Sequence, residues 1–269
     1  MNPDIIVRPL HTLDEFHRCV QITREVWGEN DLETEPFTTF VIAHHTGGQV
    51  LGVFDGNALV GFTKAYIACR DHNTLYLHSH MTAVLPSHRD RHIGRQLKLF
   101  QREDALRRGI RLIEWTFDPF ETKNAHFNIN RLGAISRRYI PNFYGITSSP
   151  LHRGMPTDRL LVEWHLESKR VVAAINDLTP EPRECPAHVH LPFPVAQGES
   201  SSPAAFSSFT SAPQAAPAPS QTPDVCSLME IQSRIRAEFT DWFSRGYAIL
   251  GVRSTPSGVD YCLAPYSDF

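Results

Sequence analysis

The sequence predicts an α/β (α+β) protein in which helices flank a mixed sheet. Strand-like runs of β-branched and aromatic residues alternate with helix-like runs over residues 1–166, and strands separated by helices are typical of this class. A second observation concerns proline: ten of the 20 prolines lie between Pro180 and Pro223. Because proline interrupts both helix and sheet, one uninterrupted core over the 269 residues is not expected.

The first elements are a strand, a helix and a hairpin. Residues 5–7 form a short β-branched strand. From Leu13 onward, apolar residues follow helical spacing until Gly28, which ends the helix. Residues 50–54 and 58–62 then flank an Asp-Gly turn, which is typical of a hairpin.

The middle of the chain continues the alternation, and its helix before Gly109 has the clearest helical pattern. The expected elements are, in order, a strand at 74–85, a helix at 93–108, a strand at 110–117, a helix at about 124–132 and a strand at 158–165.

The proline-rich stretch divides the chain into three zones. We expect a main domain at 1–180, a Pro/Ala/Ser-rich flexible linker or insertion at 181–224, and a C-terminal zone at 225–269. The last zone contains a helix at 226–244 and a hairpin with strands at 247–252 and 259–263. A single helix and hairpin are marginally stable alone, so we expect them to pack on the main domain.

Charge and cysteine content exclude several classes of protein. A formal net charge of −3 argues against a chain that is basic throughout and wraps nucleic acid. No apolar stretch approaches the roughly 18 residues of a membrane span, and no secretory signal is visible. The five cysteines are far apart and form no CxxC pair. We therefore expect a cytoplasmic protein with reduced thiols, without a disulfide framework and without a metal site.

The segment from Thr82 to Leu97 carries the clearest chemical signal. A strand ends at Pro86, a basic loop follows, and an amphipathic helix opens at the end of the loop. Backbone N–H groups at such a helix start bind phosphate readily. Four cations concentrate there: Arg89, Arg91, Arg95 and Lys98. The alternative is that these residues are only solvated surface.

The spacing Val84-x-Pro86-x-x-Arg89-x-x-x-x-Gly94 resembles the coenzyme A pyrophosphate loop of the GNAT superfamily of acyl-CoA-dependent N-acyltransferases. His92 stands where that loop has its first glycine, and a side chain is accommodated at that position if its φ is negative. Three further stretches resemble an uncharacterised branch of GNAT-like proteins: Trp-Thr-Phe-Asp-Pro at 115–119, Asn-Ala-His-Phe-Asn at 124–128 and Arg-Leu-Gly-Ala at 131–134.

The resemblance implies a mainly antiparallel central sheet in which the central strand before the loop parts from its neighbour, with pantetheine in the gap. It also implies acetyl-CoA, or another short acyl-CoA such as succinyl-CoA, as co-substrate. The backbone N–H near Val84 would polarise the thioester carbonyl. The residues assigned to coenzyme binding are Ala83, Val84, Arg89, Arg91, His92, Ile93, Gly94, Arg95 and Asn124.

The general acid is not evident from the family pattern, because Ile129 stands where many relatives have a tyrosine. Tyr139 and Tyr144 are the candidates that follow, of which we select Tyr144. Each tyrosine could instead be an aromatic residue of the core or of a lid. The resemblance places Asp158 and Arg159 near the acceptor, where Arg159 could hold a substrate carboxylate; the alternative is that the two residues have only a surface role.

Candidates for the general base lie on two strands. Period-two alternation places Glu114 and Asp118 on one face of their strand, although Glu114 could be a strand-face carboxylate and Asp118 a turn cap. His78 and His80 share a face, with Ser79 on the other, and could act as base, substrate ligand or metal pair. We select His80, Glu114 and Asp118, with Tyr144 as the acid.

These observations predict an N-acyltransferase that moves an acetyl or other short acyl group to a primary amine of a small molecule, an amino acid being one candidate. The alternative is a non-catalytic GNAT-like module that binds coenzyme A or another ligand. We expect no nucleic-acid or membrane partner, and a homodimer stays open.

Overall fold

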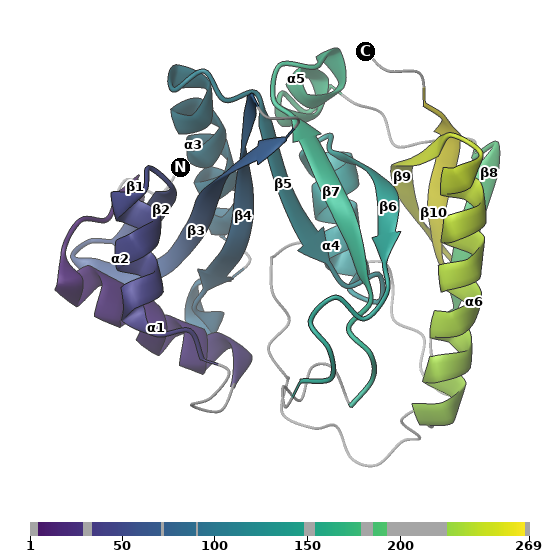
Figure 1. The fold of residues 1–269 in the computed structure, drawn as a ribbon, viewed down its shortest axis with the longest axis horizontal. Helices are drawn as coiled ribbons and strands as arrows, with labels where there is room; N and C mark the ends of the chain where they lie inside the picture. The colour runs from purple at the N-terminus through teal and green to yellow at the C-terminus, as the bar shows by residue number, and fades with distance from the viewer. Residues whose placement is uncertain are drawn as a thin grey trace. The chain divides into compact units, whose positions relative to one another are not determined.

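The computed structural model describes residues 5–28, 34–70, 73–89, 91–147, 154–178, 185–192 and 225–266. Most of the predicted linker, residues 193–224, lies outside the described residues. The described chain forms two compact units (Figure 1): the first ends at Trp115, and the second begins at Thr116. None of the helices in the described ranges is long and apolar enough to cross a membrane.

The first unit contains five strands in chain order. They are β1 (Ile5–Pro9), β2 (Gln49–Asp55), β3 (Ala58–Arg70), β4 (Thr74–Val84) and β5 (Leu112–Phe117), whose last two residues begin the second unit. The first three pairings are antiparallel, and β4 and β5 are parallel. The predicted hairpin is therefore present, with strands longer than the pattern indicated.

Three helices flank this sheet (Figure 1): α1 (Leu13–Trp27), α2 (Phe37–His45) and α3 (Ile93–Arg107). In α2, Phe40 packs edge-on against Phe62 of β3, whereas α3 contacts the opposite face through Lys98 and Ser79. A capping box of Thr12 and Glu15 begins α1, and Gly28 ends it in a left-handed conformation with φ 61°.

Strand β4 contains a β-bulge in its pairing with β3. Lys64 pairs with Met81, but the next residue of β3, Ala65, pairs with Ser79. His80 is therefore an extra residue in the ladder. A bulge of this kind bends a strand and redirects a side chain, and bulges are frequent next to active sites.

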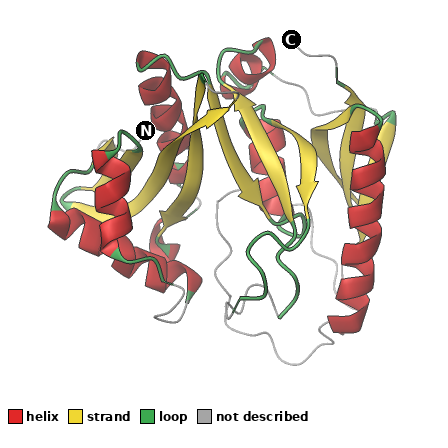
Figure 2. Ribbon diagram, in the orientation of Figure 1, coloured by secondary structure: helices red, strands yellow, loops and turns green. Residues whose placement is uncertain are grey.

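The second unit has an antiparallel sheet and its own helices. Figure 2 shows the strands in yellow and the helices in red. Its strands, in spatial order, are β7 (Arg159–His165), β6 (Ile135–Ile140), β9 (Tyr247–Thr255), β10 (Gly258–Pro265) and β8 (Ala187–Pro192). Its helices are α4 (Thr122–His126), the π-helical η2 (Phe127–Arg131), α5 (Lys169–Ile175) and α6 (Val225–Ser244).

The observed elements differ from the sequence prediction at several places. The predicted helix at 124–132 is divided into α4 and η2, and β8 lies inside the predicted linker. In β8, Ala187, Val189 and Leu191 are buried, so its period-two pattern was concealed by the surrounding prolines. Besides β8, the helices α2 and α5 and the strand β6 were not predicted.

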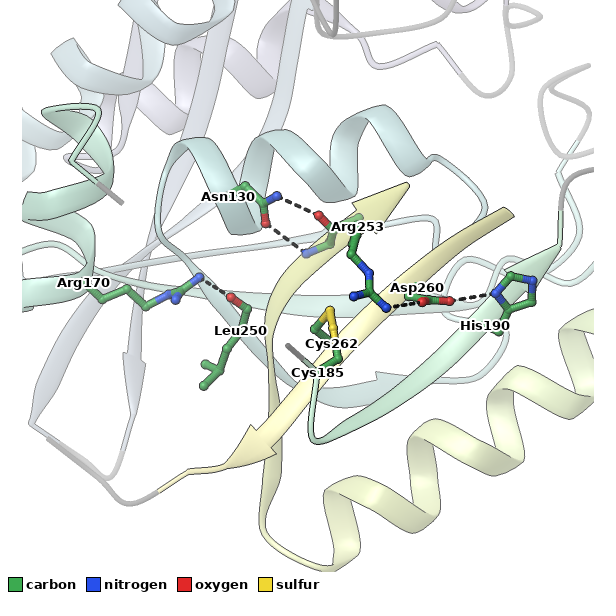
Figure 3. The surroundings of a disulfide bond; sticks show 9 residues. Asn130, Arg170, Cys185, His190, Leu250, Arg253, Asp260 and Cys262 are labelled. Carbon is green, nitrogen blue, oxygen red and sulfur yellow. Dashed lines mark hydrogen bonds and ion pairs between the residues drawn. A yellow bond between two sulfur atoms is a disulfide. The ribbon is translucent and has the colours of Figure 1, made fainter. Parts of the chain in front are cut away.

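Side chains supplement the backbone pairing of β9 (Figure 3). The Asn130 amide donates to the carbonyl of Val252 (2.7 Å) and accepts from its N–H (2.9 Å), so that one side chain pairs like a strand residue. Arg170 donates to the carbonyl of Leu250 (2.7 Å). Beside them, the Asp260 carboxylate contacts His190 and Arg253 (2.7 and 2.9 Å). The contacts of Asn130 and Arg170 connect η2 and α5 to the C-terminal hairpin, and those of Asp260 join its strands to β8 and to each other.

The expectation that the cysteines form no disulfide is wrong for one pair. Cys185 and Cys262 are bonded (Figure 3), with Cα atoms 5.0 Å apart. The pairing of β8 with β10, in which His188 lies opposite Cys262, brings together cysteines that are 77 residues apart. Disulfides are rare in reducing compartments, so the cytoplasmic location remains a prediction.

The disulfide predicts a specific thiol count. In denaturant without reductant, three cysteines should react with a thiol reagent (Cys19, Cys69 and Cys226), and all five should react after reduction. The double substitution C185S/C262S should lower the free energy of unfolding by about 2–5 kcal/mol in a denaturant titration. The exposed Cys226→Ser should change it little. Five reactive thiols before reduction would contradict the bond.

Candidate active site

The candidate site begins where β4 ends. Ala83 and Val84 are buried and pair with Phe62 and Gly61 of β3. On the other side of β4, the pairs with β5 are Leu77↔Ile113 and His78↔Glu114. Residues 79–84 therefore continue beyond those two pairs while they remain bonded to β3.

A short loop joins β4 to α3 and contains the 3-10 turn η1 (Pro86–His88). His92 is the N-cap of α3 and adopts the left-handed conformation, with φ 57° and ψ 16°. The negative φ at which a side chain would be accommodated without strain is not adopted. His92 takes the backbone conformation that glycine adopts most easily, at a cost of roughly 1 kcal/mol or more.

The start of α3 has the properties of an anion-binding end. The side chain of its N-cap, His92, makes no capping hydrogen bond, and its first turn contains no acidic residue. Its first N–H groups, near the buried Ile93 and Gly94, have no partner within the helix by geometry. The helix dipole adds a positive potential at this end.

The basic residues predicted for the loop differ in their partners and in their burial. Arg91 donates to the Asp55 carboxylate (2.9 Å), and His88 lies 3.3 Å from the same carboxylate, so Asp55 offsets part of the loop's charge. Arg89 and Arg95 are partly buried on either side of His92 in the chain. The cations near the helix start fit an anionic group.

Lys98 does not belong to this surface cluster, which corrects the sequence interpretation. Its side chain is buried against the sheet, where its amine donates to Ser79 Oγ (2.9 Å) and Gln101 Oε1 (3.1 Å) and lies 4.0 Å from the centre of the Trp115 ring. Burial lowers the pKa of Lys98 to about 7. The contact also confirms that Ser79 faces away from His78 and His80.

His78 and His80 lie on one face of β4, as the alternation predicted. Their ring centres are 6.2 Å apart, and the His80 ring centre is 5.8 Å from that of Tyr66. Burial is the main cause of a lowered pKa at His78, and His80 adds to it. The described ranges contain no group of three or more His, Cys, Asp and Glu arranged to hold a metal ion.

Glu35 and Lys64 join His80 in a polar cluster that the sequence reasoning missed. Glu35 Oε1 lies 2.7 Å from His80 Nε2, and its other oxygen pairs with the Lys64 amine. Burial lowers the pKa of Lys64 to about 7. Glu35 lies between α1 and α2, in a stretch without periodicity, so no sequence signal pointed to it.

Glu114 is buried on β5 opposite His78, and it pairs with Arg70 at the end of β3. Its carboxylate therefore has a structural partner, as expected for the alternative of a strand-face carboxylate. A buried carboxylate requires such a partner, because an unpaired charge in the interior is costly.

In the second unit, Asp118 follows β5 and organises a turn. Its Oδ1 accepts from the N–H of Phe120 (2.8 Å), as in a turn cap, and its Oδ2 is 3.5 Å from Arg159 Nη1. Burial raises the pKa of Asp118 to about 6, although Arg159 acts in the opposite direction. The group can thus hold or release a proton near neutral pH.

The two candidate tyrosines have different environments. The Tyr139 hydroxyl donates to Asp158 (2.7 Å), and burial together with that carboxylate raises its pKa, which makes it a poor acid. Tyr144 is exposed, its hydroxyl lies 3.4 Å from Thr116 Oγ1, and its ring is 5.4 Å from the Arg159 guanidinium. Of the two, Tyr144 is the better placed to exchange a proton with solvent.

Three further residues of the second unit complete the comparison with the sequence. Asp158 is buried and held by Arg236 through two bonds (2.9 and 3.0 Å), so a surface role for Asp158 is wrong. Asn124 lies on the short α4, and Ile129 is buried in η2.

Sequence comparison matches one stretch of the chain to a known family. Residues 15–133 match the acetyltransferase (GNAT) family. These residues form a GNAT acetyltransferase domain. This family match confirms the prediction of an acyl-CoA-dependent N-acetyltransferase. The match begins in α1, includes β2 to β5 and α3, and ends just after η2. No curated protein matches the chain in sequence.

Solved structures resemble the GNAT domain in fold. The yncA protein of Salmonella typhimurium, assigned as an acetyltransferase and solved with acetyl-CoA, is 15% identical with a TM-score of 0.50, covering 62% of this chain and 98% of its own. A GNAT-family protein from Desulfovibrio desulfuricans is 12% identical with a TM-score of 0.49, covering 60% and 99%. Arabidopsis thaliana NAA60, solved with a bisubstrate analogue, is 17% identical with a TM-score of 0.48, covering 60% and 98%.

Asp118 predicts a pH dependence of stability. Its folded pKa of about 6 lies above the ordinary 3.8, so its contribution to stability is complete below about pH 4 and is lost as the pH rises through 6. The loss amounts to about 3 kcal/mol, and Asp118→Asn should remove this part of the pH dependence in urea titrations. The exposed Asp241→Asn is the control. An unchanged profile in Asp118→Asn would contradict the assignment.

Proposed function

We propose that the protein transfers an acetyl or other short acyl group from acyl-CoA to a primary amine of a small molecule. The observation that carries the proposal is the position of His80 in β4. It is the extra residue of a β-bulge, it is joined to a carboxylate, and its strand leads through the short loop with η1 to the start of α3. A proton acceptor and a phosphate-binding end therefore lie on one continuous piece of chain.

The start of α3 and its loop fit the pyrophosphate of coenzyme A. The uncapped N–H groups and the arginines match two adjacent phosphates in both charge and donor type. We assign to this group Arg89, Arg91, His92, Ile93, Gly94 and Arg95, and to the pantetheine arm the backbone of Ala83 and Val84 together with Asn124. The acetyl-CoA in yncA, which shares the fold, agrees with this co-substrate.

Acyl-CoA supplies the thioester carbonyl. His80 accepts a proton from the incoming amine, whose nitrogen forms the new C–N bond while the C–S bond breaks and its electron pair leaves on sulfur. Of the predicted bases, His80 is favoured, because Glu114 is held by Arg70 and Asp118 caps a turn. Tyr144 is our proposed acid for the leaving thiolate.

The pyrophosphate assignment predicts weaker binding in two variants. In calorimetric titrations with acetyl-CoA, succinyl-CoA and free coenzyme A, Arg89→Ala and Gly94→Asp should raise the Kd roughly tenfold or more, because each removes or opposes a charge-assisted contact. Arg107→Ala, at the other end of the same helix, is the matched control. Normal binding by both variants would show that the loop has another role.

The base assignment predicts a loss of turnover without a loss of binding. With a panel of small amines and N-terminal peptides, thiol release by His80→Gln should fall roughly 10²- to 10⁴-fold in kcat while acetyl-CoA still binds. The exposed His45→Gln is the control. An unchanged kcat in His80→Gln would overturn the role of His80. Binding of acyl-CoA without thiol release for any amine would instead support the non-catalytic module.

A further inference from the structure

We propose that Glu35 is the positioning residue of His80, holding the ring so that Nδ1 takes the proton of the acceptor amine. The proposal rests on the proposed function, because it gives Glu35 a role only if His80 is the base. Glu35 comes from the segment before α2 and lies 45 residues away from His80 in the sequence.

The contacts of Glu35 fix both of its oxygens. Oε1 lies 2.7 Å from His80 Nε2, and Oε2 accepts from Thr39 Oγ1 (3.0 Å) and pairs with the Lys64 amine. Lys64 also donates to Thr39 Oγ1 (3.0 Å), so carboxylate, amine and hydroxyl form a closed set. A carboxylate bound on both sides keeps one orientation, which is what an orienting group requires.

The chemistry of the pair determines the tautomer of His80. An ionised carboxylate can only accept hydrogen bonds, so the shared proton sits on Nε2 and the basic lone pair on Nδ1. During transfer, the carboxylate also stabilises the imidazolium that forms when Nδ1 takes a proton. Atoms and charge balance within this step: the amine loses one proton, and the imidazole gains it.

The bulge explains why a positioning residue is needed. Residues on either side of His80 are aligned by their register, Ser79 with Ala65 and Met81 with Lys64, and the register shifts between them, so that His80 is the extra residue of the bulge. Its orientation is therefore set by side-chain contacts more than by the sheet. Glu35 supplies a short, directional contact from outside the strand.

Lys64 anchors Glu35 from the interior. Its side chain is fully buried, and its amine lies 4.4 Å from the centre of the Phe40 ring. A buried ammonium needs a paired anion, and Glu35, with about a quarter of its side chain exposed, reaches it from the rim of the core. Burial already lowers the pKa of Lys64 to about 7, and removing the carboxylate takes away an anion that favours the ammonium, so the lysine of the variant is neutral at pH 8.

The test compares Glu35→Gln with the wild type at pH 8, where the lysine of the variant carries no charge. Thiol release should fall roughly 10- to 100-fold in kcat, with the KM for acetyl-CoA unchanged. The acidic limb of the kcat/KM profile should move down by about one pH unit, since one negative charge beside the imidazole is lost. Among the residues that the structure describes, His78, Tyr66 and Glu35 lie around the ring, and Lys64 pairs with Glu35 behind them.

Two further variants separate positioning from folding. E35Q/K64M removes the anchor together with the carboxylate and should keep the kinetic defect, whereas Glu35→Asp retains the charge and should recover part of kcat. Glu25→Gln, which removes an exposed carboxylate paired with Arg18, is the matched control. In ¹⁵N spectra of the histidine ring, the wild type should show the Nε2–H tautomer, and Glu35→Gln should lose that preference.

The results distinguish the role of Glu35 from the proposed function on which it rests. If His80→Gln abolishes turnover but folded Glu35→Gln keeps the wild-type kcat, pH profile and ring tautomer, Glu35 is not a positioning residue. Full recovery of activity in E35Q/K64M would also overturn the proposal, because the defect would then come from the unpaired lysine. Retention of activity by His80→Gln would contradict the proposed function itself, in which His80 is the base.

Discussion

The antiparallel ladder between β3 and β4 is the constraint on which the first unit depends. It runs from Arg70↔Thr74 to Gly61↔Val84 with one irregularity, at His80. Along this ladder, alternate side chains are directed to opposite faces of the sheet. The ladder thereby directs Ser79 to α3, its bulge leaves His80 to be oriented by the cluster beside α2, and its end leads the chain into the loop before α3.

Two buried lysines on opposite faces of this sheet show how partners decide the role of a charge. Lys98 is surrounded by neutral groups, a hydroxyl, an amide oxygen and an indole ring, which suit an amine whose pKa has fallen to about 7. Lys64 experiences similar burial but has a carboxylate, Glu35, beside it. The first lysine is a core polar group, whereas the second connects the core to a histidine at the candidate site.

Much of the local structure could be predicted, because its signals are local. Helical spacing with Gly28 at its end predicted α1, and period two predicted that His78 and His80 share a face. Where the signal was weak or masked, prediction failed. α2 is apolar on most sides and has a proline as its N-cap, and β8 is enclosed by proline-rich sequence. The left-handed φ of His92 was also missed, since glycine is the residue that normally marks this conformation.

By itself, the sequence determined the order of the main elements, the basic junction before α3 and the membership of residues 15–133 in the acetyltransferase family. Those features depend on residues a few positions apart, so periodicity, caps and motif spacing record them. Only the tertiary structure decided that Glu35 meets His80 over 45 residues and that Cys185 meets Cys262 over 77. Such meetings depend on strand order and register, which arise from packing the whole chain and leave no mark on the local pattern.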